Sequence, residues 1–184
     1  MPNPESRPAA IWLQLEEEQE TSLRALIERL ANAHGTVPFQ PHLTVCTLSS
    51  EDVWDAAAGY VQHNGTLPLV VRKKGVSFST TVPMMAVVID VEDTPNLRAF
   101  RENLRQIVHA PAPTRPHISL FYSVDEAGHQ LRWSLDEHRL KDIAEECAHC
   151  VHQNEFALAR PIIVAPDRDW QAVRSWKVAR ALRA

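Results

Sequence analysis

Two short segments of the chain carry the same pattern of residue types. His42-Leu43-Thr44-Val45 and His117-Ile118-Ser119-Leu120 each place an imidazole two positions before a hydroxyl, and each follows a proline, Pro41 or Pro116. Side chains alternate between the two faces of a strand, so the histidine and the hydroxyl of each copy point the same way and the aliphatic residues point into the core. Two such strands side by side would gather two imidazoles and two hydroxyls around one cleft. Such a group can hold a phosphate between an acid and a base.

Either copy alone has a simpler interpretation, because a half-buried histidine beside Thr or Ser is common in strands. The repetition of the pattern in the same phase favours function. We therefore predict His42 and His117 as the acid and base, and Thr44 and Ser119 as donors to the phosphate oxygens, where charge grows in the transition state. Such donors make a metal unnecessary, and we expect no metal and no cofactor. We assign His117 as the base and His42 as the acid, although the pseudo-symmetry of the motifs leaves the order open.

The residues around the motifs predict an α+β fold. Apolar runs and alternation predict strands, and apolar residues at helical spacing predict helices between them. The expected strands span residues 10–15, 41–48, 69–77, 84–91, 116–123, 156–164 and 175–182. Each half of the chain holds one motif, and many strands join through turns. We therefore expect a bilobal architecture, with two pseudo-symmetric, mostly antiparallel β-sheets lining a central cleft and helices packed outside.

Composition limits the classes of protein. With 184 residues, 45% of them hydrophobic, the chain fits a single domain over residues 1–184 made of two lobes, with residues 1–8 as a loose tail. No apolar run is long enough to cross a bilayer, the first residues do not resemble a signal peptide, and three cysteines suggest free thiols in reducing surroundings. We expect a cytoplasmic protein without membrane association or an obligate protein partner. A net charge of −4 favours a small anionic ligand over long nucleic acid.

The two motifs, their proline prefixes and their separation resemble the two-histidine (2H) phosphoesterase superfamily, whose signature is a pair of His-x-Thr/Ser elements. Within it the chain looks most like the small cyclic phosphodiesterases, which open ADP-ribose 1″,2″-cyclic phosphate and nucleoside 2′,3′-cyclic phosphates. The opening Ile11-Trp12-Leu13 strand, Tyr122 and the late Ser175-Trp176-Lys177-Val178 strand favour that branch. The resemblance implies a bilobal fold and metal-independent catalysis by His42 and His117, with Thr44 and Ser119 on the phosphate.

Four further residues are candidates to line the substrate site. Trp12 and Trp176 could stack on adenine, or could fill the core. Tyr122 lies at an odd offset from His117, so alternation puts it on the opposite face unless a bulge or the end of the strand intervenes. Arg115 could steer a phosphate to the mouth of the cleft, or could be a solvated loop residue.

Other patterns carry less weight. Cys147 and Cys150 share a helix face near two histidines, but no second cysteine pair completes a structural zinc site, so packed thiols are the simpler interpretation.

Two alternative functions stay open. The first is an RNA 2′,3′-cyclic phosphodiesterase of the 2′-5′ RNA ligase-like branch, which would act on an RNA 3′ end and need a basic groove. The second is a nucleotide-binding protein without turnover.

Overall fold

The computed structural model describes residues 9–64, 66–81, 85–111, 115–124, 135–167 and 172–183. The expected tail over residues 1–8 lies outside these ranges. Within them the strands form one sheet in the order β1-β2-β5-β4-β3-β6-β7, and every neighbouring pair is antiparallel. The strands are β1 (Ala9–Leu15), β2 (His42–Leu48), β3 (Leu69–Ser79), β4 (Ala86–Val91), β5 (His117–Tyr122), β6 (Glu155–Pro166) and β7 (Trp176–Ala181).

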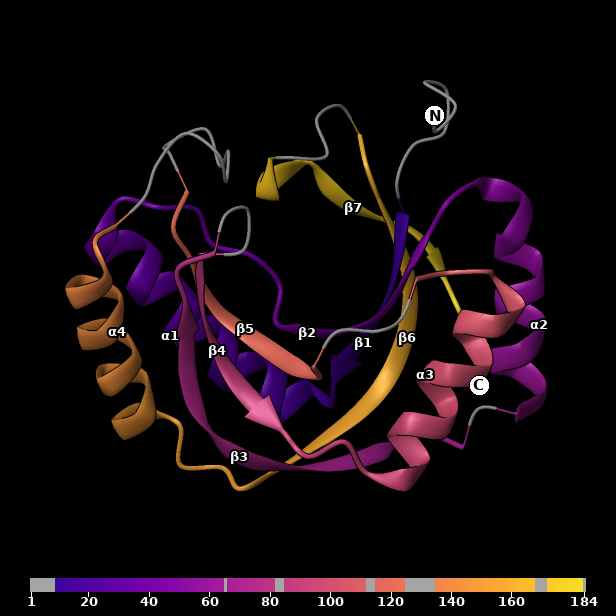
Figure 1. Cartoon of the computed structure of the whole chain (residues 1–184), viewed down its shortest axis with the longest axis horizontal. Coiled ribbons are helices and arrows are strands. Elements are labelled where there is room, and N and C mark those ends of the chain that lie inside the picture. Colours follow the sequence, from indigo (N-terminus) through magenta and orange to yellow (C-terminus); the bar gives the residue numbers. More distant parts are fainter. Residues whose placement is uncertain are drawn as a thin grey trace.

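The long strand β6 joins the two halves of the sheet. Its first residues pair with β3, its last residues pair with β7, and its other edge pairs with β1. Because β1 also begins the strand order, the sheet curls and closes on itself (Figure 1). The α+β class and the antiparallel pairing predicted from sequence are confirmed. The two sheets that we expected to be separate are joined into one by β6.

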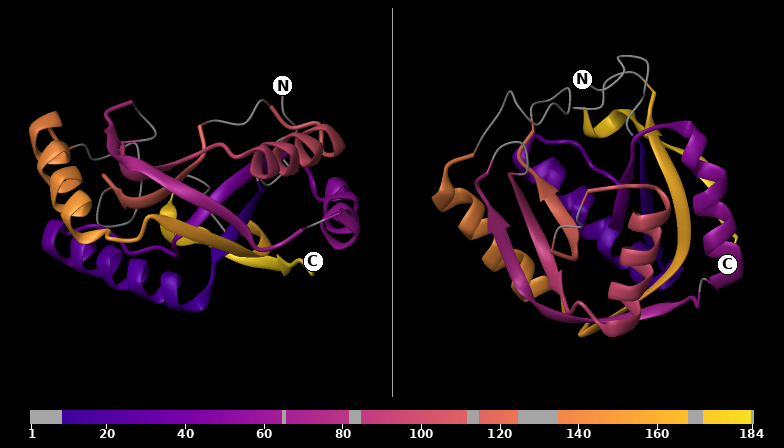
Figure 2. Two further views of the ribbon diagram at one scale, coloured as in Figure 1. Left: turned by 90° about the horizontal axis from the view of Figure 1, so that it is seen from below. Right: turned by 45° about the vertical axis from the view of Figure 1, so that its right-hand side comes forward.

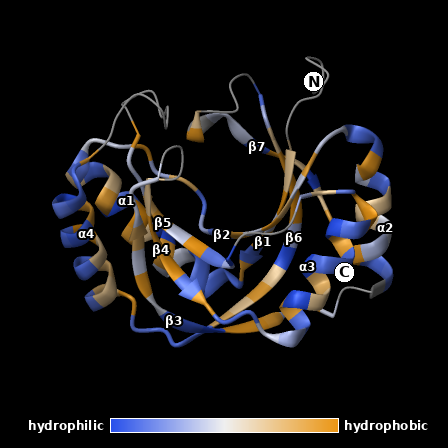
Figure 3. Cartoon of the chain, in the orientation of Figure 1, coloured by the Kyte–Doolittle hydropathy of each residue, from blue (hydrophilic) through white to orange (hydrophobic). Residues whose placement is uncertain are grey.

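Four helices lie on the outer side of this sheet in the described part of the chain. They are α1 (Glu17–His34), α2 (Trp54–Asn64), α3 (Pro95–Ile107) and α4 (Glu137–Cys150), with single 3₁₀ turns at Glu51–Val53 and Val173–Ser175. The views in Figure 2 place α1 and α4 together on one side, and α2 and α3 together on the other. Each helix presents an apolar stripe to the sheet, and Figure 3 shows the mixture of hydrophobic and hydrophilic residues along helices and strands.

The helix ends follow from local chemistry. Gly35 ends α1 in the left-handed region, at φ 65°, where glycine has no side chain to strain the backbone. Thr94 caps α3 by accepting the Leu97 amide, and Pro95 occupies the first turn. In the sequence, Ser134 with Glu137 three residues on has the pattern of a capping box and predicts Ser134, which lies outside the described residues, as the cap of α4. The cap is instead Asp136, whose carboxylate accepts the Arg139 amide.

The core lies between the sheet and the helices. The aliphatic residues of both motifs are fully buried there, as predicted: Leu43, Val45, Ile118 and Leu120 are at most 1% exposed. A second, small apolar cluster of Ala10, Ile162 and Val164 packs against Trp12 and Trp176. Since side chains alternate along a strand, the two clusters lie on opposite faces of the sheet. We call the face away from the helices the helix-free face.

The three cysteines are free thiols, as expected from their number. Burial raises the pKa of the Cys46 and Cys147 thiols to about 12, so neither is a reactive thiolate at neutral pH. No helix in the described ranges is both long and apolar enough to span a bilayer.

Candidate active site

The two motif strands are neighbours in the sheet. β2 and β5 run antiparallel, with Leu43 directly opposite Ile118. In an antiparallel pair this register sets His42 across from Ser119 and Thr44 across from His117. Since side chains alternate along a strand and Leu43 and Ile118 are buried in the core, the side chains of His42, Thr44, His117 and Ser119 all lie on the helix-free face.

Both imidazoles are held by the same backbone contact. His42 Nδ1 donates to the carbonyl oxygen of Gln40 at 2.7 Å, and His117 Nδ1 donates to that of Arg115 at 2.9 Å. A carbonyl oxygen only accepts, so Nδ1 carries the proton and Nε2 is the nitrogen left for proton transfer.

The proline prefixes help to build this contact. Gln40 and Arg115 each precede a motif proline, Pro41 or Pro116, and a proline ring confines the residue before it to extended conformations. The carbonyl that receives the imidazole proton is thus held in a narrow range of directions in both copies.

His42 is far more buried than its strand position suggested. Only 6% of it is exposed, and its ring stacks on Trp12 with centroids 3.5 Å apart and planes 8° apart. This burial lowers the pKa of His42 to about 4; the Gln40 carbonyl acts in the opposite direction, and the proximity of His117 adds to the lowering. His117 is only half-buried. The two imidazoles of the repeat therefore have different environments, and they lie close enough to interact.

The two candidate stacking residues lie together beside His42. Trp12 and Trp176 have ring centroids 6.0 Å apart, with planes 23° apart. Trp12 packs in the small cluster with Ile162 and Val164, and one of its faces carries His42. Both tryptophans are thus on the same side of the sheet as the motif histidines, and Trp12 contacts the imidazole of His42 directly.

A bulge turns Tyr122 toward the site. Val88 pairs with Ser119 but Val87 pairs with Phe121, so Leu120 is an extra residue in β5. The Tyr122 hydroxyl donates to Ser119 Oγ at 2.8 Å, and its ring packs on Phe39 with centroids 4.6 Å apart. Burial raises the pKa of Tyr122, which keeps the phenol protonated. Of the two possibilities left open by the sequence, the bulge is the one observed.

The side chain of Arg115 has two polar partners in the protein. Its guanidinium lies 2.9 Å from the carboxylate of Asp90 and donates to Ser77 Oγ at 3.3 Å. Asp90 is opposite His117 in the β4–β5 register, so this ion pair lies next to the second motif.

Sequence reasoning missed several polar residues of this face. Gln14 lies opposite His42 on β1 and is 7% exposed, Gln40 holds the imidazole, and Asp90 holds Arg115. Gln14 and Asp90 do leave a signal, because each is the lone polar residue in an otherwise apolar strand. A buried polar residue requires a partner, and these two could have been picked out on that ground.

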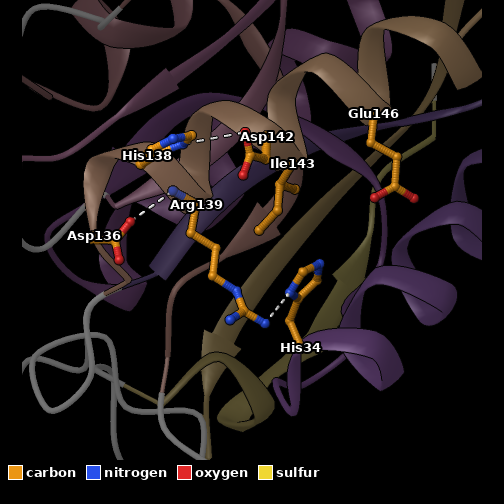
Figure 4. Close-up of a pocket in the computed structure, with 7 residues that line it drawn as sticks. All are labelled: His34, Asp136, His138, Arg139, Asp142, Ile143 and Glu146. Carbon is orange, nitrogen blue, oxygen red and sulfur yellow. Dashed lines mark hydrogen bonds and ion pairs between the residues drawn. The ribbon is translucent and has the colours of Figure 1, made fainter.

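A surface cavity of about 420 Å³ lies apart from the motifs, between α1 and α4 (Figure 4). In it the guanidinium of Arg139 donates to His34 Nδ1 at 3.4 Å, and His138 Nδ1 lies 3.4 Å from the carboxylate of Asp142. Among the described residues, no three His, Cys, Asp or Glu side chains gather in a way that could hold a metal ion.

No family model and no curated protein matches the sequence. Solved structures do match, over nearly their whole length. A phosphoesterase crystal structure has a TM-score of 0.58 and 14% identity, covering 98% of this chain and 100% of that one. LigT of Escherichia coli in complex with NADP⁺ has a TM-score of 0.57 and 14% identity, covering 98% and 99%.

LigT in complex with 3′-AMP gives similar values, with a TM-score of 0.56, 15% identity and coverage of 98% and 100%. At these identities the likeness is one of fold. The predicted resemblance to the 2H phosphoesterase superfamily is confirmed at that level: the chain has the fold of LigT and of this phosphoesterase.

Proposed function

We propose that the protein is a metal-independent cyclic phosphodiesterase. It opens the cyclic phosphate of a small nucleotide, ADP-ribose 1″,2″-cyclic phosphate or a nucleoside 2′,3′-cyclic phosphate, to a phosphomonoester. The pairing of Leu43 with Ile118 carries the proposal, because it brings two imidazoles and two hydroxyls to one face of the sheet. The fold supports it, since LigT, which shares this fold, has been crystallised with phosphate, ATP, 3′-AMP and NADP⁺.

In the proposed reaction a water attacks phosphorus while the bond from phosphorus to one ribose oxygen breaks. A neutral imidazole must take the proton of the water, and a protonated imidazole must give one to the departing oxygen. The lowered pKa of His42 suits it to be the base, which leaves His117 as the acid. This order is the reverse of the assignment made from sequence.

Thr44 and Ser119 donate to the non-bridging oxygens of the phosphate in this scheme. A hydroxyl has one hydrogen to give. Because Ser119 Oγ already accepts a hydrogen bond from Tyr122, the hydrogen of Ser119 is free to point at the substrate. Tyr122 thus acts through Ser119.

The nucleobase stacks on an aromatic side chain in this proposal. We assign this role to Trp176, which lies next to Trp12, the residue that carries His42 on its ring. Stacking of a base on an aromatic ring stabilises binding by roughly 1–3 kcal/mol.

The test is an assay of product formation. The purified protein is incubated with ADP-ribose 1″,2″-cyclic phosphate, the four nucleoside 2′,3′-cyclic phosphates and a short RNA ending in a cyclic phosphate, and the products are resolved. His42→Ala and His117→Ala variants serve as controls. We expect a phosphomonoester from a small nucleotide with the native protein only. No product from any substrate, or undiminished turnover by either variant, would contradict the proposal.

Action on RNA ends is less well supported. Arg72 pairs with Glu155, Lys73 donates to the Val151 carbonyl, and Arg180 pairs with Asp55. None of these three contacts involves a residue of the motif strands β2 and β5, so these basic side chains are held away from the motifs. A steep loss of activity with salt would favour RNA instead, since phosphate contacts release counterions. A protein that only binds nucleotides would show ligand binding and no product.

A further inference from the structure

Glu20, on the first turn of α1, is a carboxylate in an unusual position. It is only 3% exposed, and it pairs with the guanidinium groups of both Arg24 and Arg160. Burying a charge is costly unless it is paired and hydrogen-bonded, so such a residue requires an explanation. The proposed mechanism does not use it.

Glu20 also contacts the segment that precedes the first motif. The side-chain amide of Gln40 donates to Glu20 Oε1 at 3.3 Å, while the backbone carbonyl of Gln40 accepts the proton of His42 Nδ1 at 2.7 Å. Residues 36–41 belong to no helix or strand, so no ladder of backbone hydrogen bonds holds this carbonyl in place. The contact with Glu20 supplies an anchor for it.

The second motif has the same arrangement, built from different residues. Arg115 gives its carbonyl to His117, and its side chain is held by Asp90 on β4. In both motifs, therefore, a carboxylate from another element anchors the side chain of the residue two positions before the histidine. The repetition at two sites argues against a chance contact.

We propose that Glu20 is a positioning residue, which acts through Gln40 to hold His42 in the Nδ1–H tautomer with Nε2 directed toward the substrate. This inference rests on the proposed function of His42. If the anchor is lost, the Gln40 carbonyl can move, and the imidazole can turn or exchange its tautomer. A misplaced base lowers the rate of the chemical step more than it weakens substrate binding.

The decisive variant is Gln40→Met, which keeps the length of the side chain and the backbone carbonyl but removes the amide that reaches Glu20. We expect kcat on a cyclic phosphate to fall roughly 10- to 100-fold with KM little changed. Nitrogen NMR of the free protein, with its histidines labelled, should show His42 changing from one tautomer to a mixture. Glu20→Gln, which keeps an oxygen that can accept from Gln40, should retain most of the native kcat.

The matched control is Arg24→Met, which removes one ion pair of Glu20 without touching Gln40. It should leave kcat and the His42 tautomer as in the native protein. Unchanged kcat and tautomer in Gln40→Met, or equal losses in Arg24→Met, would overturn the inference. If the native protein itself opens no cyclic phosphate, the proposed function fails, but the tautomer measurement still decides whether Glu20 positions His42.

Discussion

At the scale of residues, His42 and His117 occupy equivalent positions in the repeat and yet differ in their surroundings. Trp12 covers the ring of His42, whereas His117 stays half-buried beside an exposed arginine. Burial penalises the charged imidazole of His42 and lowers its pKa. The same side chain thus meets two different environments in the two motifs.

This difference predicts the pH dependence of turnover. Since the pKa of His42 is lowered to about 4, the acid limb of the kcat/KM profile should lie near pH 4 and not near 6.5. In Trp12→Ala the imidazole gains water, its pKa rises, and the acid limb should move to higher pH. Rate measurements from pH 3.5 to 8 on both proteins test this. An acid limb at the same pH in both would show that Trp12 does not set the pKa.

The same group predicts a dependence of stability on pH. The folded pKa of His42, about 4, lies below the ordinary value of 6.5, so the unfolded chain takes up a proton first as the pH falls. The stability that neutral His42 contributes to the folded state is therefore fully present above about pH 6.5. Between that pH and pH 4 the free energy of unfolding falls by on the order of 3 kcal/mol. Urea unfolding at pH 7 and pH 4.5 should show a smaller loss in His42→Gln than in the native protein.

Tyr122 and Ser119 should act as one unit. Tyr122→Phe removes the hydroxyl that orients Ser119 and keeps the ring against Phe39, so we expect kcat to fall about 3- to 10-fold, which corresponds to the net value of one hydrogen bond. In a Ser119→Ala background the same change should have little further effect, because its target is gone. Additive losses in the double variant would mean that Tyr122 contacts the substrate directly.

At the scale of elements, the contact between β2 and β5 is short but central. The two strands have one paired position, Leu43 with Ile118, and both residues are fully buried beneath the site. The bulge at Leu120 in β5 then redirects the end of that strand. The geometry of the site therefore depends on a few core residues at this crossing.

Truncation at this crossing should weaken the whole fold. Leu43→Ala leaves a cavity in the core and should lower the free energy of unfolding by about 2–5 kcal/mol. Val70→Ala, on β3 at a position that is 52% exposed, is the control and should change it by less than about 0.5 kcal/mol. Denaturant unfolding of both variants measures the difference. Equal small effects would show that the crossing tolerates a cavity.

At the scale of the whole molecule, closure through β6 makes the two halves one sheet, which supports the proposal of a single domain. Closure also pairs both edges of β1, which would otherwise be an open edge of the sheet. The helices lie outside the sheet and leave its other face to the motifs. The site is thus built on strands, which position side chains more precisely than loops do.

Activity should be independent of added metal and only weakly dependent on salt. The proposed scheme uses imidazoles and hydroxyls alone, and the net charge of −4 provides no general attraction for a polyanion. Turnover of a nucleoside 2′,3′-cyclic phosphate should therefore survive EDTA and change little between 50 and 200 mM salt. Loss of activity in EDTA that zinc or magnesium restores would contradict the metal-independent mechanism.

Much of the architecture could be predicted from sequence because it depends on local patterns. Alternation and helical spacing identified the strands and helices to within a few residues, and the repeat identified two strands that are neighbours in the sheet. The cap of α4 was predicted at Ser134 and found at Asp136, since several adjacent polar residues can cap a helix and only the packing selects one. The orientation of Tyr122 depended on a bulge, which alternation by itself does not reveal.

By itself the sequence determined which faces of the two motif strands carry imidazole and hydroxyl, since that follows from the period of a strand. Tertiary structure alone decided that β2 and β5 are neighbours, that Trp12 covers His42, and that Glu20 reaches Gln40. These contacts join residues far apart in the chain or on different elements. Their existence depends on how all the strands and helices pack together, which no local pattern of residues encodes.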